Sequence, residues 1–101
     1  MSLHPKQAIW KYPIRIDATS TFVNIPIGAS LLHVDSNPKL LGSSDSLAVW
    51  YWVDTEETAT EEREFRPFAT GEEIPPYWWY LGTVVRESGL VWHLHERIWN
   101  D

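Results

Sequence analysis

The sequence contains no cysteine, so neither a disulfide bond nor a thiolate metal site can form in this chain. That composition is compatible with a reducing cytoplasm. The longest uninterrupted apolar run, residues 47–53, is far shorter than the roughly 20 residues that a membrane-spanning helix needs. Residues 1–7 also lack the apolar segment of an export signal. We therefore expect a soluble protein that is not exported and does not act at a membrane.

Basic residues are scarce as well. Eight Lys and Arg oppose fourteen Asp and Glu, which gives a formal net charge of -6. No basic cluster stands out, so the average electrostatic field repels a phosphate backbone and argues against general nucleic-acid binding. The same charge suits a protein that docks on the basic surface of another protein.

Complete catalytic signatures are also missing. The chain has no Gly-x-Ser-x-Gly nucleophile motif, and its five glycines form no phosphate-binding loop. Most carboxylates fall in the runs 56–57, 61–64 and 72–73, which are typical of solvated faces rather than of a catalytic pair with separated pKa values. We expect a non-enzymatic protein without a cofactor.

A chain of 101 residues is long enough for one core but not for two. We expect a flexible N-terminus over residues 1–7, a single β domain over residues 8–97 and a C-terminal tail over residues 98–101.

The run 47–54, Leu-Ala-Val-Trp-Tyr-Trp-Val-Asp, is the longest β-branched and aromatic stretch and predicts a central strand. Its two faces are both apolar: Leu47, Val49, Tyr51 and Val53 share one, and Ala48, Trp50 and Trp52 share the other. We expect a second sheet to cover one face, and a loop or a partner chain to cover the other. A homodimer is one way to supply that cover.

Six further segments have strand patterns: residues 8–16, 21–25, 30–35, 63–69, 77–85 and 90–97. The segments 36–46, 55–62 and 70–76 read as loops, and Gly28 and Ser88-Gly89 suit turns. Seven short strands without a helical period predict an all-β, mainly antiparallel fold, either a small β-sandwich or a partly open barrel.

Two prolines limit where their strands can lie. Pro13 and Pro67 cannot donate a hydrogen bond to a β-ladder. We therefore expect the strand around Pro13 at a sheet edge or at a bend, and the strand around Pro67 away from the centre of its sheet.

Seven tryptophans are more than a core this small requires. Trp78 and Trp79 are adjacent on one strand and must point to opposite faces, and the same alternation separates Trp50 and Trp52 from Tyr51. Exposed aromatic rings beside acidic segments are typical of protein interfaces and of stacking sites. The alternative, that these rings close the ends of a small barrel, stays open. The interface candidates are Trp50, Trp52, Trp78, Trp79, Glu56, Glu57, Glu61, Glu72 and Glu73.

His93 and His95 share one face of a strand, so they could supply two nitrogen ligands to a metal ion. A metal-dependent enzyme would need a third ligand, for which His33, Glu64 and Glu96 are candidates. We favour the simpler interpretation, in which the neighbouring Trp92 and Leu94 point to the core and both histidines lie on the wetter face. A further hypothesis uses His93, His95 and Arg97 as polar contacts to a nucleotide or signalling molecule that stacks on tryptophan.

Several segments together resemble a family of small uncharacterised proteins encoded by tailed bacteriophages. They are Trp-Lys-Tyr-Pro at 10–13, Ile-Pro-Ile-Gly-Ala at 25–29, Leu-Ala-Val-Trp at 47–50, Glu-Arg-Glu-Phe at 62–65, Tyr-Leu-Gly-Thr-Val at 80–84 and Trp-His-Leu at 92–94. The family often has His after its Thr-Gly pair, where this chain has Glu72.

The resemblance implies an accessory protein that acts in the cytoplasm of an infected bacterium, but it implies no established activity. Our first hypothesis is a protein that binds, and inhibits, a host protein, for instance a defence component with a basic surface. A phage protein as partner and a minor structural role in the virion stay open.

Overall fold

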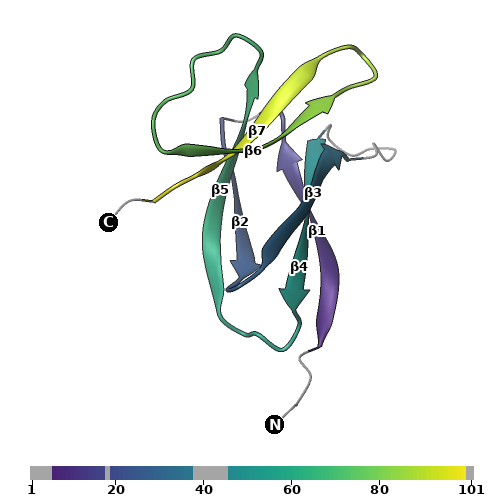
Figure 1. Ribbon diagram of the computed structural model, residues 1–101, viewed down its shortest axis with the longest axis vertical. Helices are drawn as coiled ribbons and strands as arrows, with labels where there is room; N and C mark the ends of the chain where they lie inside the picture. Colours follow the sequence, from purple (N-terminus) through teal and green to yellow (C-terminus); the bar gives the residue numbers. More distant parts are fainter. Residues whose placement is uncertain (1–5, 18, 38–45, 100–101) are drawn as a thin grey trace.

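The computed structural model describes residues 6–17, 19–37 and 46–99. Seven strands form two antiparallel sheets that are not closed into a barrel (Figure 1), which confirms the predicted all-β fold. The strands are β1 (Gln7–Arg15), β2 (Thr21–Pro26), β3 (Ser30–Ser36), β4 (Ser46–Asp54), β5 (Thr60–Ala69), β6 (Trp78–Val85) and β7 (Val91–Arg97). Most of the expected N-terminal segment and of the loop 36–46 lies outside the described residues.

The predicted central strand is β4, which lies between β1 and β3 in a three-stranded sheet. Its partner β1 is an edge strand, as Pro13 requires, and Pro13 lies opposite Ala48. The other sheet has the strand order β2-β5-β7-β6.

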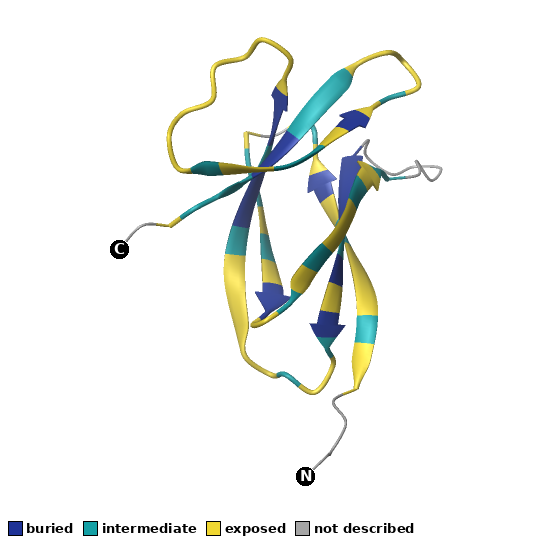
Figure 2. Ribbon diagram, viewed as in Figure 1, coloured by how far each residue is buried: buried dark blue, intermediate teal, exposed yellow. Residues whose placement is uncertain are grey.

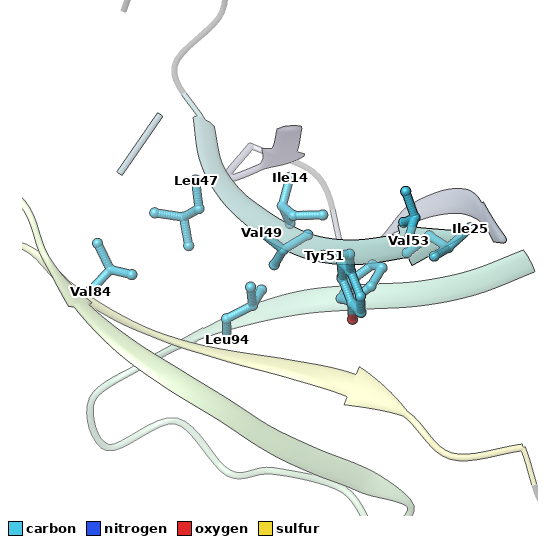
Figure 3. Close-up of a cluster of buried hydrophobic side chains, with 9 residues drawn as sticks. Ile14, Ile25, Leu47, Val49, Tyr51, Val53, Val84 and Leu94 are labelled. Carbon is cyan, nitrogen blue, oxygen red and sulfur yellow. The ribbon is translucent and has the colours of Figure 1, made fainter. Parts of the chain in front are cut away.

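The core lies between the two sheets. From β4, the alternate residues Leu47, Val49, Tyr51 and Val53 are fully buried and face the four-stranded sheet (Figures 2 and 3). The four-stranded sheet contributes Phe65, Val84 and Leu94 to the same core. Each such side chain contributes about 1.5–3 kcal/mol on burial, so alternation along β4 is what holds the sheets together.

The sheets approach each other closely where β6 passes β3. A Cβ atom at Gly82 would lie 3.3 Å from the Cβ atom of Val34. The small residue in β6 therefore allows the valine of β3 to pack against the backbone.

Strand β5 corrects two expectations. It begins at Thr60, so Glu61 and Glu62 belong to a strand rather than to a loop. It is also interior to its sheet, although it contains Pro67. The reason is an offset between its two partners: β2 pairs with residues 60–65 and β7 with residues 65–69. Pro67 thus has a neighbouring strand on one side only.

The hairpin between β6 and β7 is confirmed. The Arg86 N–H donates to the Leu90 carbonyl at 2.8 Å, and Gly89 has a φ of 89°. Gly28 likewise has a φ of 88° in the turn before β3. The described residues include no helix long and apolar enough to cross a membrane.

Candidate binding surfaces

The candidate interface residues fall on two separate surfaces. One group lies around the connection from β4 to β5, and the other around the start of β6 and the end of β7 (Figure 1). The connections before and after β5 lie at opposite ends of this ten-residue strand, which spans roughly 30 Å at about 3.3 Å per residue. The structure therefore does not bring Glu56 and Glu57 together with Glu72, Glu73, Trp78 and Trp79.

We call the first surface the acidic end. It comprises Ile9, Trp50 and Trp52 on the outer face of the three-stranded sheet, together with Asp54, Glu56, Glu57, Glu61 and Glu62. Trp52 is 42% exposed and lies directly opposite Ile9, which is 56% exposed. Trp50 is half-buried, and its ring centroid lies 5.4 Å from that of His33.

The predicted cover of the outer face of β4 is incomplete within the described part of the chain, because Ala48 is buried there but Trp52 is not, and cover by a partner chain stays a prediction. Among those residues, the outer face keeps Trp52 in contact with solvent, whereas the inner face is buried completely. The physical reason is that the second sheet covers the inner face only.

Hydrogen bonds hold the connection after β4 in place. An Asp54 carboxylate oxygen accepts from the Glu56 N–H at 2.9 Å, and a Glu57 carboxylate oxygen accepts from the Ala59 N–H at 2.9 Å. The Thr55 N–H donates to the Lys6 carbonyl at 2.9 Å, which ties the connection to the start of β1. Because Asp54 and Glu57 bind backbone groups, the carboxylate of Glu56 is presented to solvent on an ordered turn.

We call the second surface the aromatic end; it comprises residues 77–80 around the start of β6 and residues 96–99 around the end of β7. Four of its rings, those of Tyr77, Trp79, Tyr80 and Trp99, are more than half exposed. Trp79 lies opposite Glu96 on the inner side of its sheet, yet it is 66% exposed. The three-stranded sheet therefore does not reach this corner of the four-stranded one.

Arg97 lies directly opposite Trp78, so its side chain is on the face of the sheet away from Trp79. Its guanidinium carbon is 5.6 Å from the ring centroid of Trp78 and 5.0 Å from that of Trp99. Its Nε atom is buried and has no hydrogen-bond partner. Beside it is a hollow of about 190 Å³, lined by Trp79, Glu96, Arg97 and Ile98. The guanidinium thus contacts two aromatic faces, those of Trp78 and Trp99.

The acidic residues of the loop after β5 have a structural role. Glu72 accepts a hydrogen bond from the Ala69 N–H at 3.1 Å and pairs with Arg66 at 3.0 Å. Its neighbour Glu73 is exposed.

The two candidate histidines do not both lie on the wetter face. His95 is only 5% exposed, because its ring packs edge-on against Phe68 at 5.1 Å and Tyr80 at 5.6 Å. His93 is half-buried, and its two nitrogens are hydrogen-bonded to Thr70 at 2.8 Å and Thr83 at 3.0 Å. The expectation failed because Phe68 and Tyr80 form a second, small aromatic cluster on the outer face. Trp92 and Leu94 do pack in the core, as expected.

Three potential metal ligands do not gather anywhere among the residues that the structure describes. Of the candidate third ligands, Glu64 is buried and accepts a hydrogen bond from the Ser20 hydroxyl at 2.5 Å. Glu96 binds Arg63.

Sequence reasoning missed the ion pair between Arg63 and Glu96, two residues on neighbouring strands. One of its two hydrogen bonds, from Arg63 Nη2 to Glu96 Oε1, is 2.7 Å long. The pairing depends on the register of strands 33 residues apart in sequence, for which no local signal exists.

Comparisons with curated proteins and with solved structures each gave no significant match. A family profile matches almost the whole chain, residues 5–100, and its description is a domain of unknown function, DUF7352. The expectation of an uncharacterised family is thereby confirmed. The chain belongs to the DUF7352 family.

Proposed function

We propose that this protein is a non-enzymatic phage accessory protein that binds and inhibits a host protein in the cytoplasm of the infected bacterium. The observation that carries the proposal is the acidic end, where exposed aromatic and aliphatic side chains adjoin several solvent-facing carboxylates. These residues come from β1, β4, the connection that follows and the start of β5.

The chemistry of this surface supports a partner with a basic surface. Tryptophan is enriched among the residues that dominate binding energy at interfaces, and the exposed indole of Trp52 supports this residue as the contact to a partner pocket. The exposed carboxylates of Glu56, Glu61 and Glu62 take part in no ion pair within the described chain. They favour a partner with a basic surface and accelerate its encounter. Proteins that handle nucleic acid, including defence components, carry such surfaces.

Charge also distinguishes this partner from a second copy of the chain. A homodimer through the outer face of β4 brings the carboxylates of both copies towards one contact, and like charges oppose association. A basic host protein neutralises them instead.

The test is a capture experiment with matched variants. The tagged full-length protein is immobilised, exposed to lysate of the host bacterium at low salt, and the captured proteins are quantified by mass spectrometry. We expect a host protein to be captured by the wild type and by Trp79→Ser, and to be lost with Trp52→Ser and with Glu56→Gln/Glu57→Gln. Equal capture by all four proteins, or loss only with Trp79→Ser, contradicts the proposal.

Inhibition is tested separately. The captured host protein is purified and its activity is assayed with wild-type protein or with Trp52→Ser. The proposal requires inhibition by the wild type alone.

A further inference from the structure

Strand β1 has a free hydrogen-bonding edge. It lies at the margin of the three-stranded sheet, and among the described strands it pairs with β4 alone (Figure 1). An antiparallel strand directs the N–H and C=O groups of alternate residues to its neighbour, and those of the residues between them to the opposite side. Every second residue of β1 therefore points its backbone groups away from β4.

Hydrogen bonds at the two ends of β1 identify these residues. The Thr55 N–H donates to the Lys6 carbonyl at 2.9 Å, so the backbone groups of the even-numbered residues point to β4 and those of the odd-numbered residues point to the free edge. The other end of the strand agrees. There the odd-numbered Arg15 donates its N–H to the hydroxyl oxygen of Thr21, in the other sheet, at 3.0 Å.

This edge has a closed half and an open half. Pro13 has no N–H to offer, and the Arg15 N–H is already bonded. Gln7, Ile9 and Lys11 direct their N–H and C=O groups outwards, and within the described part of the chain no strand pairs with them on that side. The open half, residues 7–11, is about 17 Å long.

The open half adjoins the acidic end. Ile9 and Trp52 form a pair without mutual backbone hydrogen bonds, the kind in which side chains approach most closely. Gln7 lies opposite Asp54, where the acidic connection to β5 begins. A strand added beside β1 thus has the apolar pair near its middle and carboxylates near one end.

Trp10 favours such an addition on the inner side of the sheet. Its side chain points inwards, because it lies opposite the inward-facing Tyr51, yet it is 42% exposed while Tyr51 is fully buried. Since β1 is the last strand of its sheet in the described chain, the indole lies at the margin of the core. An inward-pointing apolar side chain of an added strand can cover it.

Charge favours a strand from the partner over one from a second copy of this chain. Open sheet edges pair readily with other strands. A second copy brings the same carboxylates to the contact, where like charges repel. A partner segment with basic residues at the end beside Gln7 meets Asp54 and Glu56 instead. Lys11 disfavours basic residues at the other end of that segment.

We propose that an extended segment of the partner adds a strand to the free edge of β1, antiparallel to it like every strand pair of this structure. Its backbone bonds to Ile9 and Lys11, and its inward apolar side chains cover Trp10. Its carboxyl-terminal end lies beside Gln7 and carries the basic residues. The inference rests on the proposed function and names the structural element through which the partner binds.

Substitution of Lys11 tests the edge. Lys11→Pro removes one outward N–H and leaves the bonds to β4 in place, as Pro13 does in the natural sequence. Lys11→Thr is the matched control, because it removes the same side chain but keeps the N–H and suits a strand. Thermal unfolding verifies that both variants are folded.

The first measurement uses the host protein that the wild type captures. We expect its affinity to fall about tenfold or more in Lys11→Pro, and to stay at the wild-type level or above it in Lys11→Thr. Equal affinities for these two variants overturn the inference. The proposed function survives that result if Trp52→Ser still loses the host protein.

The second measurement needs no host protein. Random peptides displayed on yeast are selected on the full-length protein, and amide exchange is followed by NMR. We expect selected peptides to alternate apolar and polar residues and to carry lysine or arginine near the carboxyl-terminal end. They should slow exchange of the Ile9 and Lys11 amides, and leave the Ala8 and Trp10 amides, which already bond to β4, unchanged.

The peptides separate the two failures. Peptides that bind in this way, without any host protein being captured, support the edge and contradict the proposed function. The inference is overturned if no peptide is selected, or if the selected peptides bind Lys11→Pro and Lys11→Thr equally. A dimer in sedimentation velocity that Lys11→Pro dissociates also overturns it, because the edge then belongs to a second copy.

Discussion

The guanidinium of Arg63 lies over the ring of Tyr51, 4.9 Å from its centroid. Tyr51 belongs to the three-stranded sheet and Arg63 to the four-stranded one. The contact thus joins the sheets through a cation and an aromatic face, while Glu96 on β7 neutralises the cation from the side. It places a charged group at the border of an apolar core.

Removing one member of this ion pair should cost more than removing both. In Arg63→Met the carboxylate of Glu96 is left partly buried without a partner, and we expect a loss of about 3 kcal/mol in the free energy of unfolding. The double variant Arg63→Met/Glu96→Leu leaves no uncompensated charge and should be more stable than the single variant. Urea denaturation of the four proteins in the cycle measures both values. A double variant whose loss equals the sum of the two single losses contradicts the interpretation.

Tyr51→Phe should stabilise the protein. The hydroxyl of Tyr51 is buried and has no hydrogen-bond partner, so its removal relieves an uncompensated desolvation cost of about 1 kcal/mol. The control is Tyr80→Phe, because the Tyr80 hydroxyl is hydrogen-bonded to Thr83 at 2.5 Å. We expect its removal to give no stabilisation. A melting temperature that falls in Tyr51→Phe is the contrary result.

The same tyrosine should make the protein sensitive to alkali. Burial raises the pKa of Tyr51 above the ordinary value of 10.0, so the folded state retains its proton where the unfolded chain releases it. The free energy of unfolding should therefore fall as the pH rises above about 10. In Tyr51→Phe this decline should be shallower, as urea denaturation from pH 8 to pH 11 can show. Identical slopes for the two proteins argue against the assignment.

Gly82→Val should destabilise the protein through Val34. The added Cβ atom begins 3.3 Å from the Val34 Cβ atom, and the two further methyl groups need space between β6 and β3 that is already filled. We expect a loss of about 1–3 kcal/mol, typical of overpacking. Adding Val34→Ala should restore part of the stability, since it creates room at the same point. No recovery in the double variant means that the strain lies elsewhere.

The charge of the acidic end predicts how the isolated protein associates. Because repulsion between copies opposes contact through this face, sedimentation velocity at low salt should show a monomer. Any self-association should increase as salt screens the carboxylates. A stable dimer at low salt that Trp52→Ser dissociates contradicts this and makes the outer face of β4 a homodimer interface.

The fold was predictable wherever the pattern was local. Alternation along Leu47–Asp54 identifies a central strand, and Ser88-Gly89 identifies the hairpin of β6 and β7. The position of the strand around Pro67 was predicted wrongly, because the sequence does not show that β2 and β7 pair with different halves of β5. The exposure of His95 was predicted wrongly for a similar reason, because Phe68, which helps to bury its ring, lies 27 positions earlier in the chain. The candidate residues were individually identifiable, but their division between two surfaces depends on which sheet each strand joins.

The central claim, that a basic host partner docks on the acidic end, is tested most directly by hydrogen–deuterium exchange of the protein with and without that partner. We predict that binding slows backbone exchange in residues 7–11 and 50–57, and leaves residues 77–80 and 96–99 unchanged. Protection confined to residues 77–80 and 96–99, or no protection of residues 50–57, contradicts the account.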